Sequence, residues 1–405
     1  MKITKIETSI QPELRRGLLL LRIHTDAGII GCGETWYTPD AVAGMIHGWM
    51  ARRLLGANPL DVESHWRFLY ERSTSFGSPG CEIRSLSAVD IALWDILGQA
   101  LEQPVWRLLG GRTQEQIHTY NSSGGPTYGG KLDPNDKLTG WPGYGLVGNE
   151  GPLNDYWSVI NKPADYAREL IDLGYRGLKM WTLDFAAHKP GGTLYISQKD
   201  LDEALRPMRE IRDAVGMDIE LAMDGHGFFQ LPAALRIGHA LRDLNLLWIE
   251  DGMRPDAINT MVDFRNQTGT PIAVSEMLNR IADYREVLNR NAADWIMIDP
   301  SWIGGVSQSR RICDLAQGYN VPVVIHDCTG PFNLLVGLHV GTACANVAWQ
   351  ESLRAHLTMV YPDLVDEVPA VESGAFRPPD RPGIGAAWNP QLFQSSKGVI
   401  QASEL

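Results

Sequence analysis

Residues 218–276 read DIELAMDGHGFFQLPAALRIGHALRDLNLLWIEDGMRPDAINTMVDFRNQTGTPIAVSE. Three short apolar runs of strand type in this stretch each end at an acidic residue, and these residues, Asp224, Glu250 and Glu276, are spaced 26 residues apart. Short strands that alternate with helices predict a parallel sheet, whose strand ends all lie on one face. The stretch therefore indicates an α/β fold with acidic side chains gathered at one end.

The same alternation continues on both sides of this stretch. Predicted helices at 164–173 and 201–215 each stop at a glycine, and each is followed by a strand-type run. The runs number eight in all: 117–120, 176–181, 218–223, 246–249, 272–274, 295–298, 321–325 and 346–349. Eight strands separated by helices predict a (β/α) barrel. A doubly wound open sheet would alternate in the same way, but the sequence has no strand followed by a GxGxxG phosphate loop.

The regions before and after the alternating part have a different pattern. Alternating strands at 1–10 and 18–24 and a helix at 87–101 predict a small α+β unit. We expect residues 1–116 to form this first domain, residues 117–371 to form the barrel, and residues 372–405 to pack back on the first domain. The glycine-rich stretch 124–151 is too long for a plain connection, so we expect a lid or a binding loop there.

Composition limits the class of protein. With 405 residues, 44% hydrophobic and 21% charged, the chain is typical of a soluble globular protein with a large core. The early apolar run 18–21 is too short to cross a bilayer, and the five scattered cysteines have no metal spacing, so we expect a reduced, cytoplasmic protein. A net charge of -12 argues against nucleic acid or an anionic membrane as partner. An anionic substrate would need cations concentrated in the site.

Polar residues end most of the predicted barrel strands. Asp299 and His326 follow apolar runs as the three acidic residues do. Because active sites of such barrels lie at the carboxyl ends of the strands, we expect all five side chains to converge. Three neighbouring carboxylates repel one another unless a cation neutralises them, and an all-oxygen set favours Mg²⁺. Acidic residues at strand ends can also cap the next helix, which is a weaker account of three at equal spacing.

Four residues then suggest an acid–base mechanism. Asp299 could orient His326 and raise its basicity, which is typical of a general base. Lys179, at the end of a neighbouring strand, could stabilise negative charge that develops on a substrate carboxylate. His226 comes two residues after Asp224, so it could point into the same opening and donate a proton to a leaving hydroxyl. A purely structural role for His226 fits the pattern almost as well.

Several motifs resemble the mandelate racemase subgroup of the enolase superfamily over nearly the whole chain. They are SAVDIALWD at 87–95, PVWRLLGG at 104–111, GYRGLK at 174–179, WIED at 248–251, DPSWIGG at 299–305 and AWQE at 348–351. The resemblance implies a (β/α)7β barrel, a modified TIM barrel, with an α+β capping domain formed by both ends of the chain. The cap, including residues 36–37, would then help to select the substrate.

The resemblance also implies roles for individual residues. Asp224, Glu250 and Glu276 would bind Mg²⁺, and His326, paired with Asp299, would be the base. Lys179 and Glu351 would hold the substrate carboxylate and its enediolate form. Members of the family commonly form homo-oligomers, so the resemblance implies one here as well.

One departure from the family pattern narrows the reaction. Racemases of the superfamily resemble one another in a Lys-x-Lys motif, whereas this chain has Lys179-Met180-Trp181. Tryptophan cannot accept a proton, so the second base that racemisation needs is missing. The remaining set resembles the sugar acid dehydratases, and galactonate dehydratases most, with His226 as the acid and a 2-keto-3-deoxy sugar acid as product. The alternatives are a dehydratase of gluconate, mannonate or galactarate, an epimerase, and a non-catalytic binding protein that kept the fold.

Overall fold

The computed structural model describes residues 1–77, 79–128 and 149–405. Eight parallel strands form a closed barrel, because each pairs with the next and the last, β11, pairs with the first, β4. The strands are β4 (Ile117–Ser122), β5 (Gly177–Met180), β6 (Glu220–Asp224), β7 (Trp248–Glu250), β8 (Ile272–Val274), β9 (Trp295–Ile298), β10 (Val323–Ile325) and β11 (Val347–Ser352). The predicted (β/α) barrel is confirmed.

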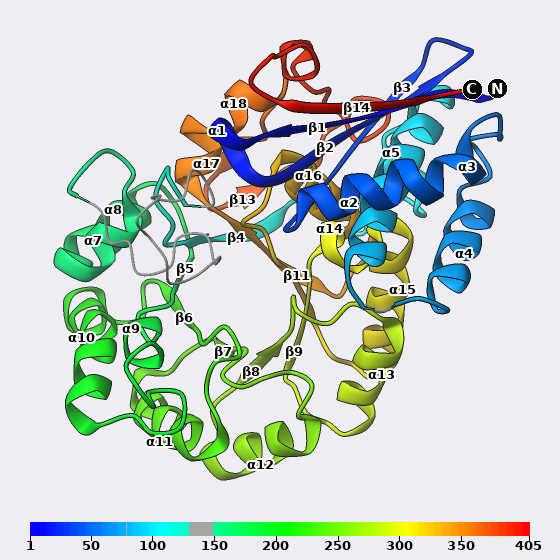
Figure 1. Cartoon of the computed structure of the whole chain (residues 1–405). Coiled ribbons are helices and arrows are strands. Elements are labelled where there is room, and N and C mark those ends of the chain that lie inside the picture. The colour runs from blue at the N-terminus through cyan, green and yellow to red at the C-terminus, as the bar shows by residue number, and fades with distance from the viewer. Residues whose placement is uncertain (78, 129–148) are drawn as a thin grey trace.

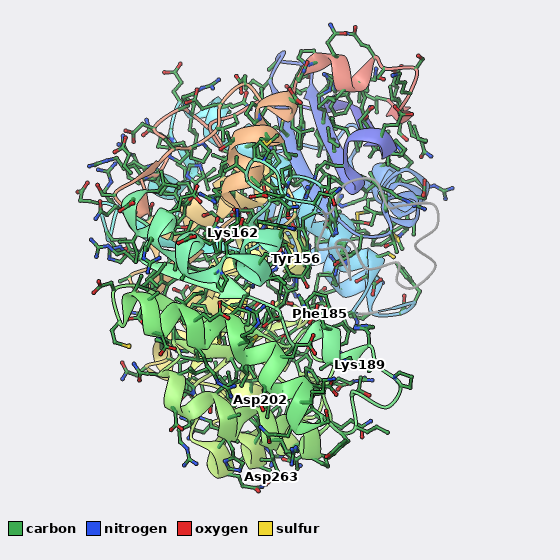
Figure 2. All side chains as sticks on the ribbon, turned by 90° about the vertical axis from the view of Figure 1, so that its left-hand side faces the viewer. Tyr156, Lys162, Phe185, Lys189, Asp202 and Asp263 are labelled. Carbon is green, nitrogen blue, oxygen red and sulfur yellow. The ribbon has the colours of Figure 1, made fainter. Side chains whose placement is uncertain are left out.

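Helices cover the outside of the barrel and connect consecutive strands (Figure 1). They are α7 (Asp155–Asn161), α8 (Pro163–Asp172), α9 (Asp184–Ala187), α10 (Gln198–Val215), α11 (Leu231–Leu241), η2 (Arg242–Leu244), α12 (Ile258–Thr268), α13 (Ile281–Asn289), α14 (Pro300–Ile303), α15 (Gly305–Gly318) and α16 (Pro331–Ala343). Two short helices, α17 (Arg354–Met359) and α18 (Tyr361–Leu364), follow the last strand. Figure 2 shows the outer surface of this helical layer, with Lys162, Lys189 and Asp202 on it.

A four-stranded sheet and a group of helices form the cap above the barrel (Figure 1). The sheet has the order β14–β1–β2–β3, so the two ends of the described chain share one sheet. Its strands are β1 (Ile3–Gln11), β2 (Arg16–Thr25), β3 (Ile30–Trp36) and β14 (Val399–Glu404). The helical part consists of α1 (Pro12–Arg15), α2 (Pro39–Met45), η1 (Ile46–Met50), α3 (Ala51–Leu54), α4 (Val62–Ser73), α5 (Cys81–Ala100) and α6 (Val105–Leu108), and the short η3 (Pro390–Phe393) precedes β14.

Two boundaries differ from the sequence-based expectation. Helix α5 begins at Cys81, six residues before the predicted start. The prediction missed this start because no side chain caps the first turn, so the usual sequence signal for a helix start is absent. The tail after Glu372 does not leave the barrel at once. A small hairpin of β12 (Val371–Glu372) and β13 (Ala375–Phe376) adds antiparallel to β4 before the chain crosses to the cap. The predicted glycine-rich lid falls mainly on residues 129–148, outside the described residues.

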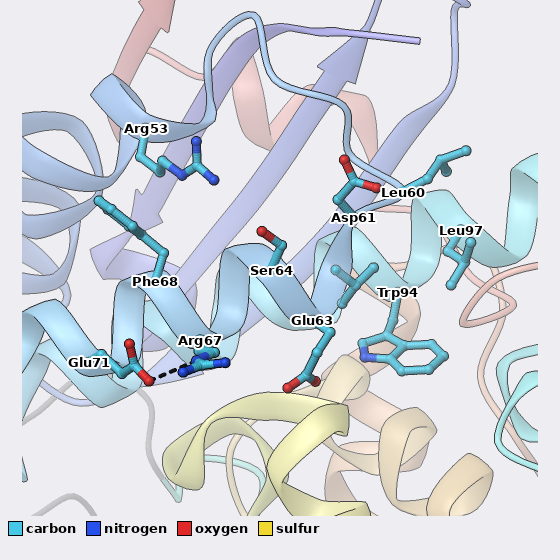
Figure 3. A pocket seen from close by; sticks show the side chains of 11 residues that line it. Arg53, Leu60, Asp61, Glu63, Ser64, Arg67, Phe68, Glu71, Trp94 and Leu97 are labelled. Atoms are coloured by element: carbon cyan, nitrogen blue, oxygen red, sulfur yellow. Dashed lines mark hydrogen bonds and ion pairs between the residues drawn. The ribbon is translucent and has the colours of Figure 1, made fainter.

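A groove of about 820 Å³ lies on the outer surface of the cap, between α3, α4 and α5 (Figure 3). Two of its charged lining residues, Arg67 and Glu71, form an ion pair with each other and are largely exposed to solvent. An exposed ion pair of this kind contributes little to the free energy of folding, and nothing in it indicates a functional site. Among the helices of the described residues, none has the length and apolar character needed to span a membrane.

Candidate active site

The alternation of side chains along the barrel strands explains why the predicted residues meet. Six buried residues fill the interior of the barrel: Tyr120, Ala222, Trp248, Ala273, Met297 and Val324. Residues two positions apart on a strand face the same side. Asp224, Glu250, Asp299 and His326 each follow one of these interior residues by two positions, so they lie just above the barrel floor at the carboxyl ends of the strands.

Lys179 lies at the centre of a cluster of carboxylates. Its Nζ is 2.6 Å from Glu250 Oε1, 2.9 Å from Glu351 Oε1 and 3.3 Å from Asp224 Oδ2. All four side chains are buried. Burial opposes the charged form of the lysine, but the charges of Glu250 and Glu351 outweigh it and raise the pKa of Lys179 well above its usual value. The lysine is therefore cationic.

The acidic cluster fits a divalent cation. Ligand atoms of Glu250, Glu276 and His326 lie within 4.8 Å of one another, and Asp224 lies opposite Glu250 in the strand register. Glu276 Oε2 is buried and has no hydrogen-bond partner among the described residues. Burial and the charge of Asp224 raise the pKa of Glu250 well above its usual value, although the charge of Lys179 opposes this. These carboxylates are the donors that Mg²⁺ prefers, although the grouping also brings in His326, which was predicted as a base.

His326 and Asp299 form a hydrogen-bonded pair. His326 Nδ1 is 2.7 Å from Asp299 Oδ2, and both side chains are buried. The other ring nitrogen, Nε2, is 3.9 Å from Glu351 Oε2 and faces the carboxylate cluster. With Nδ1 protonated and donating to Asp299, Nε2 carries the lone pair and can accept a proton. The geometry therefore has the form expected of an oriented base.

Two residues that the sequence did not single out hold this pair in place. The Asn333 side chain donates to the His326 carbonyl oxygen (2.9 Å) and accepts from the Ser301 backbone N–H (2.9 Å). Glu34, from cap strand β3, accepts from the Asn333 backbone N–H at 2.7 Å and so caps helix α16. Burial raises the pKa of Glu34 to about 8. Glu34 lies far from the pair in sequence and Asn333 lies seven residues after His326, and neither belongs to a pattern that would reveal it.

His226 is buried between two carboxylates. Its Nδ1 is 3.0 Å from Asp184 Oδ2, and its Nε2 is 3.4 Å from Asp224 Oδ2. Strand β6 ends at Asp224, and His226 has a left-handed backbone with φ 47°, so strand alternation does not place it. Burial opposes protonation, but the charges of Asp184 and Asp224 raise the pKa of His226 to about 10. The ring is therefore held as a proton donor.

Asp184 was missed by sequence reasoning. It begins α9, directly after the barrel strand that carries Lys179. The predicted site residues were found because they lie at the ends of strands. Asp184 lies four residues beyond the end of β5, so this rule did not select it. Trp181, which replaces the second lysine of the racemase motif, is buried and lies with its ring 6.2 Å from that of His226. It fills the space where a second base would stand.

A cavity of about 700 Å³ adjoins the site on the side of His226. It is bounded by the loops that follow β6, β7 and β8, and Pro79 of the cap also lines it. Asn279 lines the cavity and donates from its side chain to the Trp302 carbonyl oxygen at 3.3 Å. His226 is itself one of the lining residues, so the cavity leads to the candidate acid.

Helix α5 of the cap holds the segment that follows Asp299 by hydrogen bonds. Ser87 accepts from the Gly304 backbone N–H at 2.8 Å, Asp90 accepts from both donors of Ser307, and the Trp94 indole donates to Ser307 Oγ at 2.8 Å. Gly305 has φ 79°, and a Cβ there would lie 2.4 Å from Asp90 Oδ2, so this position requires glycine. We call Ser87, Asp90 and Trp94 the α5 stripe.

Comparisons with known proteins agree with the architecture. Residues 2–110 match the mandelate racemase / muconate lactonizing enzyme N-terminal domain, and residues 162–392 match the family described as enolase C-terminal domain-like. A D-xylonate dehydratase of Haloferax volcanii is 28% identical over 91% of this chain and 82% of its own length. A D-galactonate dehydratase family member of Streptomyces bingchenggensis is 29% identical over 91% of this chain and 87% of its own.

Solved structures extend this similarity to the whole fold. An enolase of the mandelate racemase subgroup from Agrobacterium tumefaciens superimposes with a TM-score of 0.85 at 33% identity, covering 100% of this chain and 99% of its own. The capped (β/α)7β barrel, the two family matches and these relatives lead to one conclusion. The chain belongs to the mandelate racemase / muconate lactonizing enzyme family of the enolase superfamily.

Proposed function

We propose that this protein is a Mg²⁺-dependent dehydratase of a sugar acid. One observation carries the proposal: two histidines lie on either side of a single buried cation. The contacts run from His226 to Asp224 (3.4 Å), from Asp224 to Lys179 (3.3 Å), from Lys179 to Glu351 (2.9 Å) and from Glu351 to His326 (3.9 Å). A substrate carboxylate near Lys179 would have a base on one side and an acid on the other.

In the proposed reaction, His326 Nε2 removes the proton on the carbon next to the substrate carboxylate. Negative charge then develops on the carboxylate oxygens, where Lys179 stabilises it. His226 donates a proton to the β-hydroxyl, which leaves as water, and the resulting enol tautomerises to a 2-keto-3-deoxy sugar acid. Mg²⁺ held by Asp224, Glu250 and Glu276 would add a Lewis acid at the same carboxylate.

Dehydration is supported over racemisation by the unequal surroundings of the two histidines. His326 Nε2 is 3.9 Å from Glu351 Oε2, beyond hydrogen-bond distance, whereas the two nitrogens of His226 are 3.0 Å and 3.4 Å from carboxylate oxygens of Asp184 and Asp224. An imidazole between two carboxylates is favoured in its protonated form, so it suits an acid better than a second base. The names of the relatives, which are dehydratases of xylonate, galactonate and arabinonate, support the same reaction class.

The test is a panel of sugar monoacids and diacids incubated with the purified protein, with and without Mg²⁺, and read out by trapping 2-keto acid. We expect Mg²⁺-dependent product from at least one acid, and none from the His326→Asn variant. Deuterium entering recovered substrate in D₂O without any keto acid would support an epimerase instead. Bound Mg²⁺ with neither product nor exchange on any acid would overturn the proposal.

A further inference from the structure

Arg84 places a second positive charge near the candidate base. It lies on α5 in the cap, half-buried, with its guanidinium carbon 4.4 Å from the centroid of the Trp302 ring and 5.1 Å from that of Tyr37. One nitrogen, Nη1, donates to the Trp36 carbonyl oxygen at 2.9 Å. Within residues 1–77, 79–128 and 149–405, no carboxylate lies within ion-pair distance of it. Most of its donors therefore remain available.

Trp302 supplies a further donor between Arg84 and the base. Its ring centroid is 5.1 Å from that of His326, and its side chain is buried. The indole Nε1–H has no acceptor among the described residues. A buried donor without an acceptor costs free energy, so such a group points to a ligand that brings an oxygen. Arg84 and Trp302 thus form a set of donors that lacks an acceptor, beside the reacting centre.

Two other buried arginines, Arg354 and Arg15, are held by contacts within the protein, although Nε of Arg15 has no partner among the described residues. Arg354 pairs with Asp155 at 2.7 Å and with Glu169 at 2.7 Å. Arg15, 1% exposed, donates to the carbonyl oxygens of residues 128, 328 and 329. Arg84, like Arg15, lies over an aromatic ring and has no carboxylate within ion-pair distance among the described residues, but its ring is that of Trp302, beside His326. One turn further along the same helix, the α5 stripe begins and the barrel again supplies matching polar partners.

We propose that Arg84 and the indole N–H of Trp302 bind a second carboxylate at the far end of the substrate, so that the substrate is a sugar diacid. The proposal rests on the proposed function, which puts the first carboxylate at Lys179. A guanidinium matches a carboxylate with two parallel hydrogen bonds, whereas a neutral hydroxyl would leave its charge uncompensated. Lys179 and Arg84 are then the local cations that an anionic substrate needs in a protein of net charge -12.

A series of side-chain contacts links the two cations and passes the candidate base. From Lys179 the contacts pass through Glu351 and His326 to Trp302 and then to Arg84, each step between 2.9 and 5.1 Å. A diacid bound along this wall would have a cation at each end and the base beside its carbon chain. A monoacid of the same length would leave Arg84 and the Trp302 donor without a partner.

The experiment compares monoacids and diacids of matched stereochemistry, such as galactonate with galactarate and gluconate with glucarate. For the wild-type enzyme with Mg²⁺, we expect kcat/KM for the best diacid to exceed that of its matched monoacid by about 10- to 100-fold, the effect of a charged hydrogen-bonded pair. Arg84→Met should remove this preference, because it should raise KM for the diacid much more than KM for the monoacid. Arg84→Lys should restore part of it, and Trp302→Phe should weaken diacid binding several-fold.

Arg254→Met is the matched control, because Arg254 lines the neighbouring cavity but is exposed and already paired with Asp256. It should leave the preference intact. Equal kcat/KM for monoacid and diacid in the wild type, or equal losses on both in Arg84→Met, would overturn the subsite while leaving the dehydratase proposal standing. If no acid is turned over, calorimetric binding of the same pairs to His326→Asn with Mg²⁺ decides the question, since tighter diacid binding that depends on Arg84 supports the subsite and its absence overturns it.

Discussion

The two sides of the active site are built differently around the same cation. On one side, His326 and Asp299 stand at the ends of adjacent barrel strands, and Asn333 holds both the His326 carbonyl and the loop after Asp299. On the other side, His226 lies beyond the end of its strand with a left-handed backbone, and its partner Asp184 is the first residue of the short helix α9. The first pair follows from strand geometry, and the second depends on how two loops fold.

The difference in partners also separates the two chemical roles. His326 Nε2 lies 3.9 Å from Glu351 Oε2, too far for a hydrogen bond, whereas His226 has carboxylate oxygens within 3.4 Å of both nitrogens. Substitutions of the two histidines should therefore impair different steps of the reaction. Four substitutions test this difference, and their expected effects on activity decrease from His326→Asn to Glu34→Gln.

The largest effect is expected for His326→Asn. Without the base, neither proton exchange nor elimination can begin, so turnover should fall by about 10³-fold or more. Deuterium exchange at the α-carbon, followed by NMR in D₂O, should fall together with keto acid formation. The control is His239→Asn on the outer face of α11, where the side chain is exposed. Exchange that persists in His326→Asn would mean that another residue is the base.

His226→Asn should separate the two steps. Proton abstraction does not require the acid, so α-proton exchange should persist while elimination slows by about 10²-fold. The ratio of exchange to elimination, measured in one D₂O experiment, is the diagnostic quantity. Equal losses of both steps would show that His226 acts by orienting the cluster and would remove its assignment as the acid.

Asp184→Asn should resemble His226→Asn with a smaller loss, about tenfold, because the acid remains but its partner is neutral. The negative charge of Asp184 raises the pKa of His226, so removing it lowers that pKa. A donor with a lower pKa loses its proton at lower pH, and the alkaline limb of the kcat profile should shift downward. Asp263→Asn, an exposed residue of α12, is the control. An unmoved alkaline limb would argue against the pairing.

The smallest effect on activity is expected for Glu34→Gln, behind the His326 side. Burial raises the pKa of Glu34 to about 8, above its ordinary value, so the folded state binds the proton more tightly than the unfolded state does. The protonated Glu34 carboxyl therefore contributes its full stabilisation of the folded state at low pH, and this contribution is lost as pH rises toward 8. Glutamine keeps the acceptor for Asn333 and cannot ionise, so the variant should gain on the order of a few kcal/mol over wild type above pH 8. Denaturant unfolding at pH 6 and pH 9 measures this, and parallel losses in both proteins would contradict it.

Sequence reasoning predicted the barrel because its strands are short, apolar and separated by helices that end in glycine. It also brought Asp224, Glu250, Asp299 and His326 to one face, since each ends a strand and the period of two fixes where it points. The same reasoning could not find Asp184, Glu34 or Asn333. Their positions depend on loop conformation and on contacts between residues about 30 to 300 positions apart, which no local pattern encodes.

The α5 stripe has a consequence for how this enzyme could change its specificity. One helix carries Arg84 toward the substrate region and, in its next turns, fixes the loop that follows Asp299. Exchanging the cap with that of a relative, in evolution or in the laboratory, would therefore disturb the anchoring of the catalytic loop at the same time. A viable chimera must transfer α5 together with residues 300–307 as one block. Single substitutions at position 84 are the simpler route to a new substrate.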